Sequence, residues 1–305
     1  MHRLGRRKFV RNSSVALAVI AWSRLGLDAA TTAPLISFST LACPKWSFAN
    51  ILSFAADHGY HGVELRGILG ELDLTKRREF SRANLAASRR LIEDHHQQIV
   101  CLGSSAALHH ADAKERARNL DEARRFIDLA QQLDCPHVRV FPDALPGDQD
   151  RTAAMDRISK GLLELADEAK GSKVDVLLES HGDLVATEDL LRIMQNSESP
   201  HAGMVWDICN MWSVTKEAPA LAYARLKPYI RHTHIKDLTL ADRGRGSRYV
   251  LLGTGDAPVA EALRALAAGG YSGYYSFEWE KLWHPEIDEP EIALSHYATE
   301  IRKYF

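Results

Sequence analysis

The chain has little cysteine and no excess of charge, and both shortages limit what it can be. Its 305 residues include four cysteines with no Cys-x-x-Cys spacing, too few for a disulfide scaffold. Lys and Arg total 38 against 40 Asp and Glu, so the chain lacks the basic excess of a general nucleic-acid binder. Hydrophobic residues make up 46% and charged residues 26%, which excludes fibrous, disordered and multi-span membrane classes.

The one apolar run near the N-terminus, residues 15–22, is about half as long as a membrane-spanning helix. Cations precede it and small residues, 29–33, follow it, which is the order of a cleavable export signal. Residues 5–11, with the pair Arg6-Arg7, resemble the twin-arginine export motif. We therefore predict an export signal over residues 1–30, recognised by the twin-arginine machinery. The mature chain is then periplasmic or otherwise exported and has no membrane span; a basic helix that stays attached is the alternative.

Beyond residue 35, short apolar runs alternate with longer amphipathic segments. The short runs are rich in Val, Ile, Leu, Tyr and Phe, as is typical of buried parallel strands. The predicted strands are 35–41, 61–66, 98–103, 137–141, 174–179, 203–207, 230–235 and 272–278. The predicted helices are 47–58, 82–96, 113–133, 153–169, 186–194, 218–226, 259–268 and 290–304.

Eight strand–helix units predict a single (β/α)8 TIM barrel of the α/β class over residues 35–305. Such barrels usually have about 250 residues, and no linker rich in Pro or Ser divides the chain. A doubly wound open sheet is the alternative, but it usually has a glycine-rich turn after its first strand. Here that turn, residues 40–44, contains no glycine.

Ionisable side chains stand where four successive predicted strands end. These strands finish with Glu, Asp, His and Glu, and active sites of TIM barrels lie at this end. Converging carboxylates are costly to bury unless a cation neutralises them. Three carboxylates with one imidazole suit a divalent ion, with Mn²⁺, Mg²⁺, Co²⁺ or catalytic Zn²⁺ as choices. A single strand-end acid paired with a loop cation is the alternative for any one of these residues.

The sequence motifs around these residues resemble those of a known protein family. Residues 178–181 (LESH), 206–207 (WD), 232–237 (HTHIKD) and 277–281 (FEWEK) are similar to the xylose isomerase-like barrel superfamily. Within it, they resemble the sugar phosphate isomerase/epimerase group of ketose 3-epimerases, hydroxypyruvate isomerases and inosose dehydratases. The resemblance covers residues 35–305. It implies one divalent metal ion, with Mn²⁺ as the first choice, and a sugar or keto-sugar substrate. A homo-oligomer is one option for the assembly.

The resemblance also implies roles for particular residues. The metal ligands would be Glu179, Asp207, His234 and Glu278, and the two glutamates would also act as the catalytic acid and base. Glu280 is the rival of Glu278, which falls nearer the strand end. The implied or candidate substrate contacts are His181, Asn210, Lys236, Arg66, Arg139 and Trp46.

Several of these residues have simpler alternatives. His181 can be an ordinary loop histidine, and Lys236 can form a strand-end salt bridge to Asp207 or Asp237. The arginines can form ion pairs across the barrel top. Many relatives carry His where this chain has Asn210, which cannot act as a titrating base.

A site of this kind suits proton abstraction next to a carbonyl, and hence sugar isomerisation or epimerisation. Loss of a β-hydroxyl after the same abstraction would make the protein an inosose dehydratase-like lyase. An apurinic endonuclease-like phosphodiesterase is a further alternative, disfavoured by Asn210 and the net charge of −2. The last alternative is an exported barrel that binds a sugar without catalysing a reaction.

Overall fold

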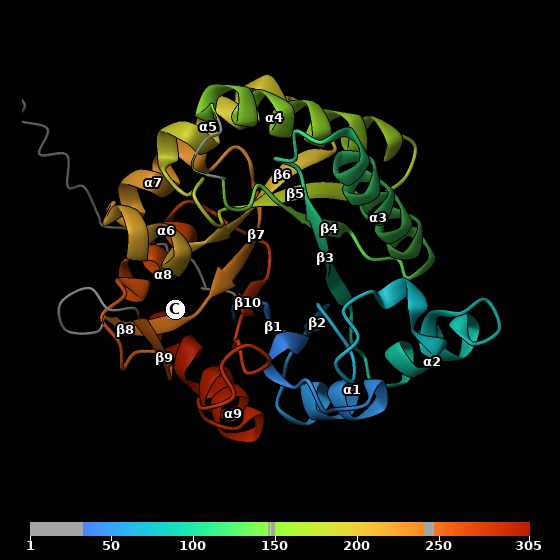
Figure 1. Ribbon diagram of the computed structural model, residues 1–305. Helices are drawn as coiled ribbons and strands as arrows, with labels where there is room; N and C mark the ends of the chain where they lie inside the picture. The colour runs from blue at the N-terminus through green and yellow to red at the C-terminus, as the bar shows by residue number, and fades with distance from the viewer. Residues whose placement is uncertain (1–32, 146, 148–149, 241–246) are drawn as a thin grey trace, which may run out of the picture. The chain divides into compact units, whose positions relative to one another are not determined.

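The strands of the chain close into a barrel in the computed structural model (Figure 1). The structure describes residues 33–145, 147, 150–240 and 247–305, and Ala33–Phe305 form one compact unit. The predicted export signal of residues 1–30 lies outside the described residues.

Eight parallel strands form the barrel, and each overlaps its predicted range. Their order around the barrel is β1-β10-β7-β6-β5-β4-β3-β2. The strands are β1 Ile36–Ser39, β2 Gly62–Leu65, β3 Ile99–Ala107, β4 His137–Phe141, β5 Asp175–Glu179, β6 Ala202–Asp207, β7 Ile230–Ile235 and β10 Tyr275–Phe277. This closed ring confirms the predicted TIM barrel and excludes the open doubly wound sheet. One difference is that β3 runs past its predicted end at residue 103.

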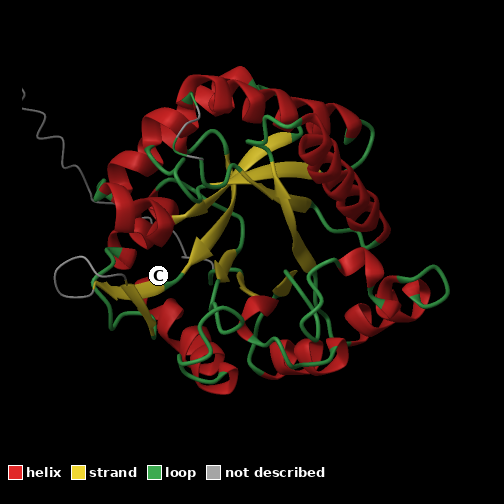
Figure 2. Ribbon diagram, in the orientation of Figure 1, coloured by secondary structure: helices red, strands yellow, loops and turns green. Residues whose placement is uncertain are grey.

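Helices surround the ring of strands on its outer side (Figure 2). Those that overlap predicted helices are α1 Phe48–Asp57, α2 Leu85–Asp94, α3 Ala113–Gln132, α4 Arg151–Glu168, α5 Thr187–Asn196, α7 Pro219–Leu226, α8 Val259–Ala268 and α9 Pro290–Glu300. Several begin at a side chain that caps them. Asp112 accepts hydrogen bonds from two backbone amides of α3, and Asp150 does the same for α4.

Helix α6, Ile208–Thr215, was not predicted, and neither was a hairpin of β8, Asp237–Leu240, with β9, Ser247–Val250. Helix α6 begins directly after β6, because the Asp207 side chain accepts the backbone N–H of Asn210. No loop separates the two elements, so the sequence shows no boundary there. The hairpin departs from the loop after β7, outside the repeating strand–helix pattern.

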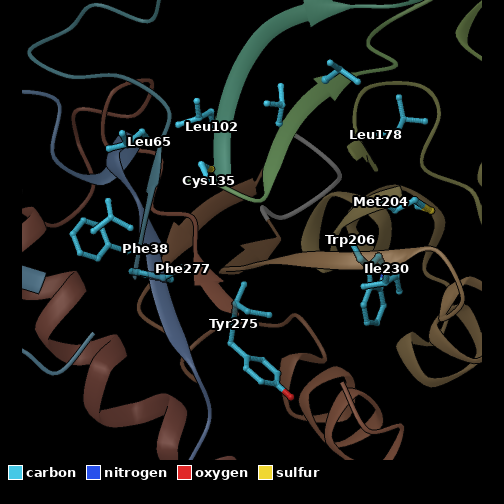
Figure 3. Close-up of a cluster of buried hydrophobic side chains, with 14 of the residues drawn as sticks. Phe38, Leu65, Leu102, Cys135, Leu178, Met204, Trp206, Ile230, Tyr275 and Phe277 are labelled. Carbon is cyan, nitrogen blue, oxygen red and sulfur yellow. The ribbon is translucent and has the colours of Figure 1, made fainter. Parts of the chain in front are cut away.

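The two faces of each barrel strand carry different side chains. On β10, Tyr275 and Phe277 alternate with Ser276 and then Glu278, as the period of two in a strand requires. The apolar residues face the helices, since the Phe277 ring lies 4.4 Å from that of Tyr297 on α9. Figure 3 shows part of this apolar layer, with Phe38, Leu65, Leu102, Met204, Trp206 and Phe277 among the side chains drawn. The polar set is left for the barrel interior.

Candidate metal centre and active site

Four strands bring four ionisable side chains together at their carboxyl ends. Glu179 and Asp207 end β5 and β6, His234 lies one residue before the end of β7, and Glu278 directly follows β10. All four are buried, and one potential ligand atom of each lies within 4.8 Å of the others. These are the four residues predicted as metal ligands. We call Glu179, Asp207 and Glu278 the carboxylate side of the barrel.

The imidazole of His234 stands between the two glutamates. Its Nδ1 lies 3.3 Å from Oε1 of Glu179 and 3.3 Å from Oε1 of Glu278. Oδ2 of Asp207 is 3.9 Å from the same nitrogen. Burial acts to lower the pKa of His234, but Glu278, Glu64 and Glu179 outweigh burial and raise it well above its ordinary value.

Lys236 supplies a cation to the carboxylate side. Its Nζ lies 2.8 Å from Oδ2 of Asp207 and 2.7 Å from Oε2 of Glu278. A third contact of 2.6 Å reaches Oε1 of Glu280, which is not part of the four-residue cluster. The simpler expectation of a salt bridge to Asp207 is therefore confirmed, and Glu278 rather than Glu280 belongs to the cluster.

The carboxylates repel one another even with Lys236 present. Burial raises the pKa of Asp207 to about 7; Glu278 and Glu179 add to the rise, and Lys236 opposes it. Glu179 shifts the other way, because His234 and Arg139 outweigh burial and lower its pKa. The pKa of Glu278 also falls well below its ordinary value, with His234 and Lys236 outweighing burial.

The donor set fits a divalent cation. Three carboxylates and one imidazole nitrogen form a site rich in oxygen with one nitrogen, which suits Mn²⁺, Mg²⁺, Co²⁺ or Zn²⁺. Burial is the main cause of the raised pKa of Asp207, and the neighbouring Glu278 and Glu179 add to it. A bound cation would act against this rise.

A second layer holds His234 from the opposite wall of the barrel. Glu64 on β2 accepts a hydrogen bond of 3.0 Å from Nε2 of His234 and another of 2.8 Å from Nε2 of His232. The hydroxyl of Ser276 donates to the same carboxylate over 3.3 Å. Because Nε2 of His234 is engaged by Glu64, its Nδ1 is the nitrogen that faces the cluster, as in carboxylate–histidine–metal arrangements.

The two arginines predicted as substrate contacts are buried in the barrel. Nε of Arg139 on β4 lies 3.1 Å from Oε2 of Glu179, and its guanidinium stacks 3.7 Å from the centroid of the Phe141 ring. Arg66 directly follows β2, and its Nη2 donates to Oγ of Ser105 over 3.0 Å. An ion pair at the barrel top, one of the two expectations for these arginines, is thus present at Arg139.

Asn210 and His181 lie beside Glu179. Nδ2 of Asn210 is 3.5 Å from Oε1 of Glu179. His181 follows β5 by two residues; its Nδ1 is 3.6 Å from Oδ1 of Asp143, and its ring is 4.4 Å from that of Phe141. Burial acts to lower the pKa of His181, but Asp143 and Glu179 outweigh it and raise the pKa.

Trp46, a predicted substrate contact, lies in the segment that follows β1. Its ring packs 4.8 Å from that of Phe54 on α1. It lines a cavity of about 710 Å³ formed by segments that follow β1, β2 and β10, and none of the four cluster residues lines that cavity.

His232 and Tyr249 are the neighbours of the site that were not predicted. His232 precedes His234 by two residues, so a strand period of two would have placed both on the inner face. Tyr249 belongs to the unpredicted hairpin, and its ring lies 5.3 Å from Nζ of Lys236. No pattern in the sequence indicates that contact.

The fold and the site define a TIM barrel with a buried cluster of potential metal ligands. The sequence profile of the xylose isomerase-like TIM barrel family matches residues 52–297, and the chain belongs to this family. No helix in the described part of the chain is long and apolar enough to cross a membrane.

Individual relatives are distant. Fructoselysine 3-epimerase of Shigella flexneri is 24% identical over 187 residues, which cover 59% of this chain and 64% of the relative. The zinc-bound IolI protein superposes with a TM-score of 0.76 at 18% identity, over 88% of this chain and 99% of the other. The 3-keto-D-glucoside 4-epimerase YcjR of Escherichia coli gives a TM-score of 0.71 at 16% identity, over 88% and 99%. These structures show the shared fold.

Proposed function

We propose that this protein is a metal-dependent sugar isomerase or epimerase that moves a proton next to a carbonyl group. The convergence of two glutamates carries the proposal: Glu179 and Glu278 come from different strands, and each places a carboxylate oxygen 3.3 Å from the same nitrogen of His234. Two carboxylates around one cation provide a base and an acid on either side of a bound substrate. The names of the epimerase relatives support the same reaction class.

Glu179, Asp207, His234 and Glu278 would hold the cation, with Mn²⁺ as the first choice. When bound, such an ion acts as a Lewis acid that stabilises the enediolate formed from a ketose. The zinc atom named for the IolI structure supports a divalent ion in this family without identifying the metal used here.

The chain's own residues divide the proton transfer. Arg139 helps keep Glu179 ionised, as a general base must be, and Lys236 does the same for Glu278. One glutamate takes the proton from the carbon next to the carbonyl, and the other, which is ionised in the free site, takes up a proton from solvent before it supplies one to the substrate. Return to the opposite face of that carbon gives epimerisation, and return to the neighbouring carbon gives isomerisation.

Three further side chains would position the substrate. Nδ2 of Asn210 lies close enough to Glu179 to donate to a substrate oxygen beside the base. His181 follows Glu179 by two residues and lies 3.6 Å from Asp143, and it would contact a hydroxyl group of the substrate. Lys236, whose Nζ contacts three carboxylates, would position the substrate indirectly by holding Glu278 in place.

Solvent-deuterium incorporation tests the proposal. The protein, purified without chelator and supplied with Mn²⁺, is incubated in D₂O with a panel of ketoses, keto-inositols and hydroxypyruvate, and exchange is followed by NMR. We expect exchange at one carbon next to the carbonyl, and its loss in Glu179→Gln. Glu115→Gln, an exposed glutamate on α3 paired with Arg118, is the matched control. Unchanged exchange in Glu179→Gln, or no divalent metal by elemental analysis, contradicts the proposal.

We also propose that residues 1–30 direct export through the twin-arginine machinery and are then removed. The observations behind this are the order of cations, apolar run and small residues, and the pair Arg6-Arg7. Mass spectrometry of the protein from a bacterial periplasmic fraction should show a chain that lacks about 30 residues. Changing both arginines to lysine should retain the full-length chain in the cytoplasm. Equal export of that variant contradicts the proposal.

A further inference from the structure

Two guanidinium groups are buried at strands β2 and β4, which carry none of the four predicted metal ligands. Arg66 is 5% exposed and Arg139 1% exposed, although arginine is almost never fully buried without partners. They project from β2 and β4, the neighbours of β3 on either side. We call Arg66 and Arg139 the arginine side of the barrel.

Gly103 on β3 makes room for both arginines. A Cβ atom at this position would lie 2.7 Å from Cδ of Arg66 and 2.9 Å from Nη2 of Arg139. Both distances are shorter than those that Cβ atoms make in real structures, so a larger residue would not fit here. The two arginine side chains pass over the glycine from opposite sides. The lack of a side chain at Gly103 therefore brings two positive charges together inside the barrel.

The two arginines differ in how well they are paired. Arg139 is engaged by Glu179, by the ring of Phe141 and by the backbone carbonyl of Ser104, to which its Nη1 donates over 2.9 Å. Arg66 donates from Nη2 to Ser105, but its Nη1 is buried and has no hydrogen-bond partner among the described residues. A buried charged donor without a partner is costly, and native structures rarely keep one without a reason.

The nearby carboxylates are already committed to other groups. Those that act electrostatically on Arg66 are Glu179, Glu278 and Glu122. Glu179 pairs with Arg139, Glu278 pairs with Lys236, and Oε1 of Glu122 accepts the backbone N–H of Ser105. Burial and the neighbouring Arg139 accordingly lower the pKa of Arg66 to about 10. The arginine side has an unused donor and no anion of its own to receive it.

We propose that Nη1 of Arg66, with Arg139 beside it, binds an anionic group at the end of the substrate remote from the reacting carbonyl. This inference rests on the proposed function and names the substrate class: a ketose that carries a terminal carboxylate or phosphate. The carboxylate side holds the cation and the reacting carbons, while the arginine side holds the charged tail. A carboxylate or phosphate accepts the planar donors of arginine in a geometry that a neutral hydroxyl group cannot match.

Three ketoses with the same reacting end test the proposal. Fructose ends in a neutral hydroxymethyl group, fructuronate in a carboxylate at that position, and fructose 6-phosphate in a phosphate. Their binding to the Mn²⁺-loaded protein is measured by titration calorimetry. We expect one of the two anions to bind about ten- to a hundredfold more tightly than fructose, the range of a charge-assisted hydrogen bond. Which anion binds more tightly identifies the natural tail.

The Arg66→Met variant should remove that preference, so that the favoured anion and fructose bind within about twofold of each other. Arg66→Lys should restore part of it, because lysine keeps the charge without the planar fork. Arg118→Met removes an exposed arginine on α3 and is the matched control, with the preference retained. Circular dichroism and Mn²⁺ affinity verify that Arg66→Met is folded and holds the metal.

The result that overturns the anion subsite is equal binding of all three sugars, or an equal effect of Arg66→Met on all of them. This outcome is distinct from failure of the proposed function, which is measured by deuterium exchange. If fructose exchanges but charge makes no difference, the epimerase proposal stands and the subsite is wrong. If the anion preference depends on Arg66 but no ketose exchanges, the subsite stands and the proton-transfer chemistry is wrong.

Discussion

The carboxylate side and the arginine side of this barrel solve the burial of charge in opposite ways. On the carboxylate side, charges are crowded: Asp207 and Glu278 share Lys236, and the pKa of Asp207 still rises to about 7. On the arginine side, Arg66 keeps an unpaired nitrogen. The crowded side places three carboxylates around Lys236 and His234, while on the other side Arg66 has no carboxylate partner among the described residues. A metal ion would balance the first side and an anionic substrate the second.

Two histidines of the barrel have pKa values that shift in opposite directions. The pKa of His234 is raised, because the pull of Glu278, Glu64 and Glu179 exceeds the effect of burial. His137 on β4 precedes Arg139 by two residues and so shares its face of the strand. Burial, together with His232, lowers its pKa to about 3. The pKa values of the two histidines therefore shift in opposite directions, that of His234 because of carboxylates and that of His137 chiefly because of burial.

The largest effect is expected from removing either proton-transfer group on the carboxylate side. Glu179→Gln and Glu278→Gln should each lower the rate of exchange or turnover by about a hundred- to ten-thousandfold, as for other general acids and bases. Steady-state assays with saturating Mn²⁺ measure the loss. If one of the two variants keeps full activity, that residue is a ligand without a role in proton transfer.

The next effect separates metal binding from stability. Asp207→Asn should weaken Mn²⁺ binding by about a hundredfold or more, because it removes a charged ligand from the cluster. Yet the metal-free variant should be no less stable to heat than the parent, since burial disfavours the charge of Asp207. Competition with a metal indicator and thermal unfolding measure the two quantities. A large loss of metal-free stability would show that the main role of the Asp207 carboxylate is to pair with Lys236 and not to bind the cation.

A smaller effect is expected from the layer behind the ligands. Glu64→Gln should lower Mn²⁺ affinity by about ten- to a hundredfold, the usual range for a group that orients a metal-binding histidine. Ser276→Ala is the matched control, because it removes the weakest of the hydrogen bonds to Glu64 described above and leaves His234 oriented. Equal affinity in the parent and Glu64→Gln would show that strand β7 alone fixes the ring of His234.

The smallest effect concerns acid stability through His137. Its folded pKa of about 3 lies below the ordinary value of 6.5, so the unfolded chain binds more protons between these values. The stabilising contribution of neutral His137 is therefore complete above pH 6.5 and declines as the pH falls toward 3. At pH 5.5 the loss should be about 1 kcal/mol.

Urea unfolding at pH 7 and pH 5.5 measures this difference. In His137→Phe the free energy of unfolding should decline less between the two pH values than in the parent chain. The control is His96→Asn, an exposed position with a φ of 52° that asparagine tolerates. If the free energy of unfolding declines equally in His137→Phe and in the parent, His137 is not the group responsible for the loss of stability.

Much of the fold could be predicted from the sequence because strand and helix periods are local. Runs such as 137–141 and 230–235 match β4 and β7 at both ends. Helix α6 and the β8–β9 hairpin escaped prediction because neither belongs to the repeating unit. The first begins without a loop, and the second is an insertion after β7.

The four candidate ligands were also within reach of the sequence. In a parallel barrel the carboxyl ends of neighbouring strands meet, so side chains that end β5, β6, β7 and β10 have to converge. Trp46 shows the limit of that reasoning: it follows β1 in sequence, and its place after a strand does not indicate that its ring packs on Phe54. A position after a strand does not determine where a loop side chain points.

The sequence by itself determined the number of barrel strands, the face that each of their residues occupies and the chemistry at the strand ends, since these depend on neighbours within a few residues. Only the tertiary structure decided which charges meet across the barrel. Glu64 on β2 reaches His234 on β7, Arg66 and Arg139 pass over Gly103, and one guanidinium nitrogen is left without a partner. These contacts join segments far apart in the chain, and the closure of the barrel sets their distances.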